Sequence, residues 1–129
     1  MNKQRILVLL TLIASPLFAQ ESTATPCSKG DIVLQLQCLD QAIIDHKRTR
    51  QTWITKLEKQ VELKQNHTGN TQLFLSFQRS KHSFDSYISD SCQWRYLNEL
   101  PDTKHAALKY KRCELKIIDQ QVEILKGQF

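Results

Sequence analysis

The chain has 129 residues, including 18 Lys and Arg, 13 Asp and Glu, and four cysteines. This length suits one domain of modest size, and a formal charge of +5 is too mild an excess to indicate a nucleic-acid-binding protein. Two basic clusters, HKRTR at 46–50 and KYKR at 109–112, are interpreted as solvated helix faces. The alternative is a patch for an anionic partner.

The first 19 residues predict a secretory signal peptide. Lys3 and Arg5 precede an apolar run at 6–13, and Ala19 is the small residue before a cleavage point. The run is far shorter than the roughly 20 apolar residues of a membrane-spanning helix. We therefore expect an exported, periplasmic protein without an integral membrane segment.

Cleavage of this peptide would leave a lead-in at 20–30 and a helical domain at 31–129, and would lower the formal charge from +5 to +3 through loss of Lys3 and Arg5. All four cysteines remain. An even number in a small exported chain indicates two disulfides, and no CxxC or paired histidines suggest a zinc site. Sequence alone permits three pairings, and a reactive thiol at Cys92 is the alternative.

Residues 31–64 are predicted to form an amphipathic helix, because apolar side chains recur at steps of three and four, interrupted only at 45–52. They are Ile32, Leu36, Leu39, Ile43, Trp53, Leu57 and Val61. Ser28 and Asp31 resemble a capping box, which would start the helix near residue 30 or 31. The following NHTGN stretch ends it, since Gly69 can turn left-handed and Asn70 can cap the next helix.

Two further helices follow in the same way. The second carries the stripe Leu73, Phe77, Phe84, Ile88 and Cys92, and ends in NELPDTK, because Pro101 lacks an N–H and disfavours helix at Leu100. The third spans about 104–126 with Ala106, Tyr110, Cys113, Ile117 and Ile124 on one face, widened by Leu108, Leu115, Ile118, Val122 and Leu125. The chain is predicted to be all-α, a small antiparallel three-helix domain braced by two disulfides.

Helix geometry favours one of the three pairings. Antiparallel helices bring together residues equally distant from their turn, and the midpoint of Cys92 and Cys113 falls inside NELPDTK. The other pair is then Cys27 with Cys38. A continuous helix would hold these two about 16 Å apart, too far for a disulfide, so the lead-in must fold back over the helix.

No catalytic constellation emerges from the sequence. The four histidines, His46, His67, His82 and His105, are scattered, and no HExxH, GxSxG or glycine-rich phosphate loop is present. His82 and Asp85 lie one helical turn apart, but they are interpreted as an exposed polar pair. Trp53 and Trp94 are interpreted as core or interface residues. We expect a non-enzymatic protein without metal or cofactor.

The run KHSFDSYISDSC at 81–92 resembles a segment of the LprI-type lysozyme inhibitor family. Phe84 stands at the family's tryptophan, Tyr87 at its tyrosine and Cys92 at its cysteine. The early cysteine followed by a short helical segment corresponds to QCLDQAI at 37–43, and a later cysteine and leucine correspond to Cys113 and Leu125. Four positions depart from the family pattern: Lys81, Ile88, Ser89 and Gln121.

This resemblance implies a small helical periplasmic protein that binds a lysozyme or another muramidase. Animal lysozymes are basic, so an inhibitor gains from a locally acidic docking face. The acidic residues concentrated around the second helix and its turn are the candidate contacts: Asp85, Asp90, Glu99 and Asp102. A toxin-immunity protein and a periplasmic helical chaperone with an exposed apolar groove are the alternatives.

Overall fold

The computed structural model describes residues 27–128, which form three helices and no strand. They are α1 (Ile32–Thr68), α2 (Gln72–Asn98) and α3 (Thr103–Lys126). The all-α prediction and its three helices are confirmed. The predicted signal peptide at 1–19 and most of the lead-in at 20–30 lie outside the described residues.

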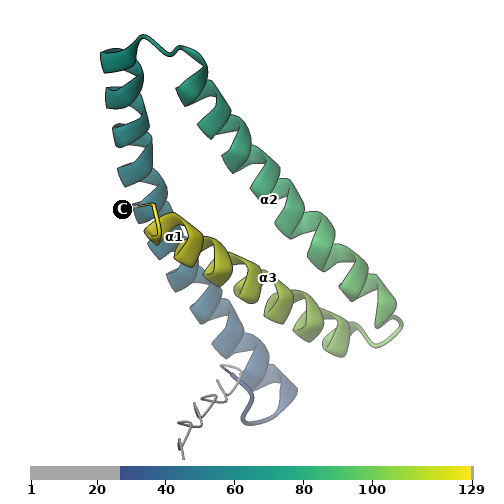
Figure 1. Cartoon of the computed structure of the whole chain (residues 1–129). Helices are drawn as coiled ribbons and strands as arrows, with labels where there is room; N and C mark the ends of the chain where they lie inside the picture. Colours follow the sequence, from purple (N-terminus) through teal and green to yellow (C-terminus); the bar gives the residue numbers. More distant parts are fainter. Residues whose placement is uncertain (1–26, 129) are drawn as a thin grey trace, which may run out of the picture.

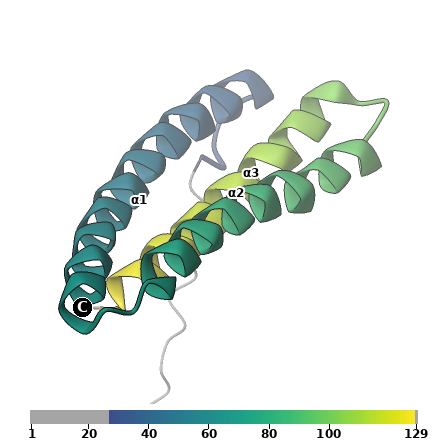
Figure 2. The ribbon, with the colours of Figure 1, turned by 90° about the horizontal axis from the view of Figure 1, so that it is seen from above.

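Helices α1 and α2 form an open V, and α3 runs back from the far end of α2 to the middle of α1 (Figure 1). Helices α1 and α2 meet at a tip, diverge, and leave an angle into which α3 returns (Figures 1 and 2). Helix α2 runs antiparallel to both neighbours, whereas α1 and α3 run in the same direction. Gln35 near the start of α1 pairs with Arg112, and Arg50 further along α1 pairs with Gln121 further along α3. The end of α3 therefore lies beside the middle of α1 (Figure 1).

Local signals set the ends of α1. Asp31 is the N-cap, and its Oδ1 accepts hydrogen bonds from the N–H groups of Val33 and Leu34 at 2.9 Å each. The cap is thus this single carboxylate and not a box with Ser28, which is exposed in the preceding loop. Gly69 takes the expected left-handed conformation with φ of 72°, and its N–H donates to Gln65.

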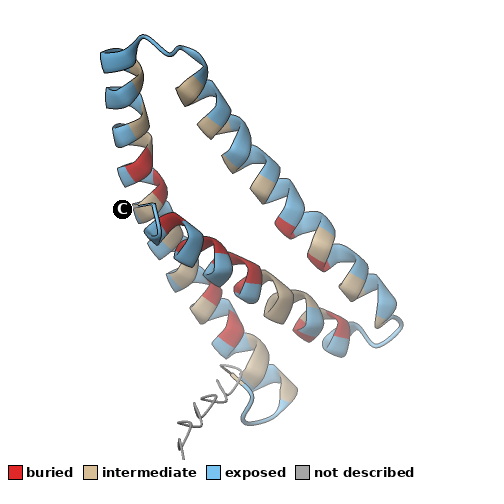
Figure 3. Ribbon diagram, in the orientation of Figure 1, coloured by how far each residue is buried: buried red, intermediate tan, exposed pale blue. Residues whose placement is uncertain are grey.

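The buried side chains form two clusters that α3 joins (Figure 3). The larger cluster contains Leu39, Ile43, Ile88, Cys92, Leu108, Leu115, Ile117 and Ile118, and the smaller contains Ile54, Leu57 and Leu125. Ile124 was expected on the buried face of its helix, yet it is 60 % exposed. Ile124 lies on the same side of α3 as Cys113, which faces α2. At Ile124, however, α3 has diverged from α2 toward α1, so this side of the helix is no longer covered (Figure 1).

Both predicted disulfides are present. Cys92 and Cys113 join α2 to α3 with their Cα atoms 5.6 Å apart, and Cys92 is fully buried. Cys27 reaches Cys38 with Cα atoms 5.5 Å apart. Positive φ values at Cys27 and Gly30 turn the lead-in back over the start of α1, as the distance argument required.

A polar cluster centred on Glu58, ten residues before the end of α1, joins α1 to α2. Its carboxylate accepts hydrogen bonds from Lys81 Nζ, at 2.9 Å, and from Gln78 Nε2, both on α2. The hydrogen bond from Lys81, followed by that from Gln78, lowers the pKa of Glu58 below its usual value of 4.5. Ionised Glu58 is therefore favoured in the folded state.

Replacing both Cys92 and Cys113 with Ala should lower the free energy of unfolding by about 3 kcal/mol, because the unfolded chain regains the freedom of a closed loop. Helix content at low temperature should stay unchanged, since each helix retains apolar side chains to bury. Chemical denaturation followed by circular dichroism measures both. An unaltered denaturation midpoint would show that this bond does not brace the fold.

Acidification should destabilise the protein partly through Glu58. Because its pKa is lower in the folded than in the unfolded chain, its contribution is present above about pH 4.5 and is lost as the pH falls through the folded value. Denaturation midpoints measured between about pH 6 and pH 3 should therefore fall less steeply in Glu58→Gln than in the wild type. Glu62→Gln, at an exposed position of the same helix, is the control and should keep the wild-type slope.

Candidate functional site

The side of α2 turned away from the core carries an exposed stripe of large side chains. Tyr87, Asp90, Trp94 and Leu97 follow steps of three and four, which place them on one side of the helix. Tyr87, Trp94 and Leu97 are each more than half exposed. We call these four residues the outer face of α2. Trp94 is too exposed to be a core residue, which leaves the interpretation that it is an interface residue.

The four predicted acidic contacts do not gather into one patch. Asp85 binds Arg50 Nη2 at 2.7 Å, and Glu99 lies 3.7 Å from Lys109 Nζ. Asp85 and Asp90 are five residues apart, so they point about 140° away from each other around the helix. Within residues 27–128, the side chain of Asp90 has no hydrogen-bond or salt-bridge partner, and Asp90 is the one predicted contact on the outer face.

Asp102 has a structural task at the start of α3. It is the N-cap, and its Oδ1 accepts the N–H of His105 at 3.1 Å while Oδ2 lies 2.7 Å from His105 Nδ1. The backbone hydrogen bond, reinforced by the imidazole, lowers the pKa of Asp102. The ionised carboxylate therefore caps the N-terminus of α3.

Arg50 links all three helices, although it belongs to a basic cluster predicted to be a solvated face. Its side chain is only 14 % exposed. The guanidinium donates from Nε to the side-chain oxygen of buried Gln121 on α3 and from Nη2 to Asp85 on α2, and it lies 5.7 Å from the ring centre of Phe84. The sequence contained a signal for this burial, since Arg50 falls midway between Ile43 and Leu57 at steps of seven.

The remaining cations of the two basic clusters mostly bridge helices. Lys47 Nζ lies 2.6 Å from Glu114, Lys111 pairs with Asp40, and Arg112 Nη2 donates to Gln35 at 2.7 Å. Arg48 is the contrast, since its side chain is 75 % exposed. Pairing within the protein occupies these charges, so the structure does not favour a patch for an anionic partner.

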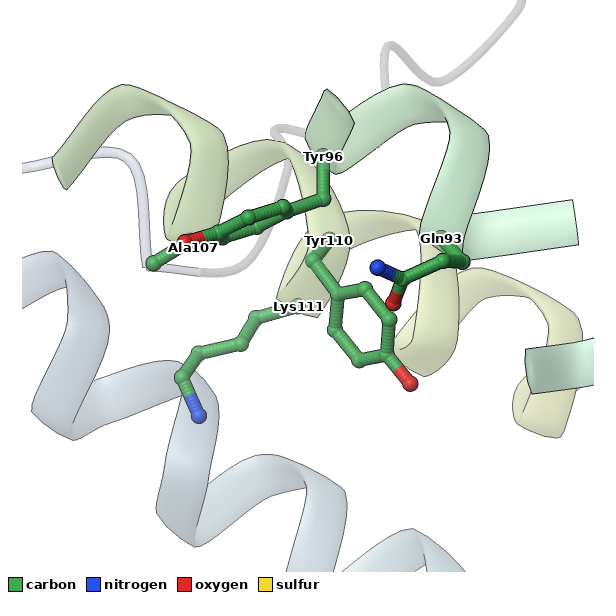
Figure 4. Close-up of a pocket in the computed structure, with 5 residues that line it drawn as sticks. All are labelled: Gln93, Tyr96, Ala107, Tyr110 and Lys111. Atoms are coloured by element: carbon green, nitrogen blue, oxygen red, sulfur yellow. The ribbon is translucent and has the colours of Figure 1, made fainter. Parts of the chain in front are cut away.

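A hollow of about 340 Å³ lies between α2 and α3, beside the disulfide that joins them. Its lining residues are Gln93, Tyr96, Ala107, Tyr110 and Lys111 (Figure 4). Tyr96 and Tyr110 are half-buried, and Gln93 is exposed at the rim. Sequence reasoning missed this hollow, because its residues become neighbours only when α2 and α3 pair.

No protein-family model, curated protein or solved structure matches the chain. None of the helices within residues 27–128 has the length and hydropathy that crossing a membrane requires. The same residues contain no group of three or more His, Cys, Asp or Glu side chains placed to hold a metal ion. The outer face of α2 and the hollow are the two surface features from which a function can be argued.

Replacing Arg50 with Met should lower the free energy of unfolding by about 1–3 kcal/mol, the cost of leaving a buried acceptor such as Gln121 without its donor. Arg48→Met, two residues away and exposed, should change it by no more than about 0.5 kcal/mol. Urea denaturation of the two variants makes the comparison. Equal effects would mean that the guanidinium of Arg50 does not hold the helices together.

Proposed function

We propose that the protein is an exported, non-enzymatic inhibitor that binds a muramidase through the outer face of α2. One observation carries the proposal: Tyr87, Trp94 and Leu97 are exposed on one side of a helix around the unpaired carboxylate of Asp90. Tyrosine and tryptophan are enriched among the residues that dominate protein–protein binding. The core does not need these side chains, because α2 buries Ile88 and Cys92 on its other side.

The residues that match the lysozyme inhibitor pattern fall into two groups by their exposure. Cys92 is buried in its disulfide, and Phe84 is half-buried beneath Arg50. Tyr87 is exposed, with its ring centre 6.0 Å from that of Phe84. In the proposal, Phe84 and Cys92 fix the helix while Tyr87 contacts the partner.

The net charge of the chain and the carboxylate of Asp90 would have opposite effects on binding to a basic muramidase. The chain without its predicted signal peptide is net positive, so its net charge repels a basic enzyme at long range. Binding then depends on burying the apolar side chains of the outer face, while Asp90 receives one cationic side chain of the enzyme. A carboxylate that loses its water on binding must be paired in this way, which also makes the contact specific.

The test is binding of the oxidised protein to a panel of muramidases, followed by calorimetry and by inhibition of cell-wall lysis. Trp94→Ala should weaken binding by about 2 kcal/mol or more, as expected for a central aromatic contact. Asp90→Lys should slow association and place two cations against each other. Both variants should keep the wild-type stability, because these side chains are exposed.

Two substitutions on α1 serve as matched controls. Leu63→Ala removes an apolar side chain that is 60 % exposed, and Glu62→Lys reverses an exposed acid. Neither should affect binding. The muramidase proposal fails if no enzyme of the panel binds, or if the α1 and α2 variants weaken binding equally. Capture of a single toxin at one-to-one stoichiometry would favour the immunity alternative, and unsaturable binding of unfolded proteins would favour a chaperone.

A further inference from the structure

The hollow between α2 and α3 has two aromatic walls. In Figure 4 the ring of Tyr96 extends from α2 toward Ala107, the ring of Tyr110 extends from α3 below it with its hydroxyl away from Tyr96, and the carboxamide of Gln93 points toward Tyr110. The aliphatic stem of Lys111 forms the remaining side. A volume of about 340 Å³ is at the lower end of the range for small-molecule sites.

The spacing of the two helices that carry the walls is set by a covalent bond. Gln93 follows Cys92 directly, and Tyr110 lies one helical turn before Cys113, so the disulfide between these cysteines sets the distance across the hollow. Cys92 is fully buried, which anchors that bond in the core. A preorganised site avoids part of the entropic cost of binding.

The polar groups at the rim are available and carry little net charge. Within residues 27–128, the side chains of Gln93, Tyr96 and Tyr110 have no hydrogen-bond partner. Lys111 contributes its stem to the wall, but its ammonium group is paired with Asp40 of α1. The hollow therefore offers aromatic surface, two phenolic hydroxyls and one amide, and its charge favours neither a strong anion nor a strong cation.

We propose that this hollow binds one neutral pyranose ring that carries an acetamido group. The C–H face of such a ring can pack on the face of Tyr96 or Tyr110, and its hydroxyls can reach the phenols. The carboxamide of Gln93 has one acceptor and two donor hydrogens, which complement the N–H and C=O of an acetamido group. The volume accommodates a single ring of this kind.

The tyrosines of this site are turned away from Tyr87 and Trp94, although Gln93 at its rim lies one helical turn before Leu97 of the outer face. Tyr96 follows Tyr87 by nine residues, which is about 900° of rotation and puts the two tyrosines on opposite sides of the helix. Sugar binding therefore goes beyond the proposed muramidase contact. The two proposals can be tested apart, because Tyr96→Ala alters the hollow and Tyr87→Ala alters the outer face on the opposite side of α2.

The test is a titration of ¹⁵N-labelled, oxidised protein with chitotriose, followed by two-dimensional NMR. Saturable shifts should map to backbone amides around Gln93, Tyr96 and Tyr110. Tyr96→Ala should weaken binding by about tenfold, because the hollow loses one of its two aromatic faces. Gln93→Ala, at an exposed position that leaves the core intact, should also weaken it, and a glucose trimer without acetamido groups should bind more weakly.

Tyr87→Ala is the matched control, since it removes the same side chain from the opposite side of α2 and should leave the chitotriose titration unchanged. The absence of saturable shifts would overturn the proposal. So would shifts that centre on Tyr87 and Trp94, or a titration that neither Tyr96→Ala nor Gln93→Ala weakens. Equal binding of the glucose trimer would overturn the assignment of the acetamido group.

Discussion

The packing of α3 into the angle between α1 and α2 is the interaction on which the rest of the structure depends. Seven buried apolar residues belong to α3, against four in α1 and two in α2, so α3 contributes more buried apolar side chains than either neighbour. Ile118 is fully buried, and the same helix reaches both hydrophobic clusters. Without α3, the diverging parts of α1 and α2 would face solvent, and Cys92 would have no partner.

Polar contacts then determine how the three helices align. Pairs between α1 and α3, such as Lys47 with Glu114 and Asp40 with Lys111, match only when the two helices run parallel in this register. Each pair has one partner that is largely exposed, which limits its contribution to stability, but a shifted register would oppose like charges. Arg50 differs from these pairs because it donates to both other helices. It fixes the relative position of α1, α2 and α3 at one point.

The sequence predicted the helices, their turns and the disulfides because these follow from local chemistry. Gly69 and Pro101 interrupt apolar stripes, and the equal distances of Cys92 and Cys113 from a turn are visible without coordinates. Predictions that required the angles between helices were less successful. Ile124 is exposed because α3 leaves α2, Ile54 is buried although the predicted stripe omitted it, and Arg50 lies inside although its neighbours are charged. The acidic residues were grouped by closeness in sequence, whereas helical rotation separates Asp85 from Asp90 and capping occupies Asp102.

Helix α2 contributes little to the core, and this leaves its surface free for other tasks. Single exposed apolar residues are ordinary on any protein. A tyrosine, a tryptophan and a leucine within three turns, on one side of a helix and around an unpaired carboxylate, form an ordered group that packing does not explain. On the side opposite Tyr87, half-buried Tyr96 lines the hollow beside the Cys92–Cys113 disulfide. Since both surfaces are built on one rigid helix braced at Cys92, a ligand in the hollow and a protein on the outer face would meet the same fixed scaffold, and each could bind without requiring the fold to move.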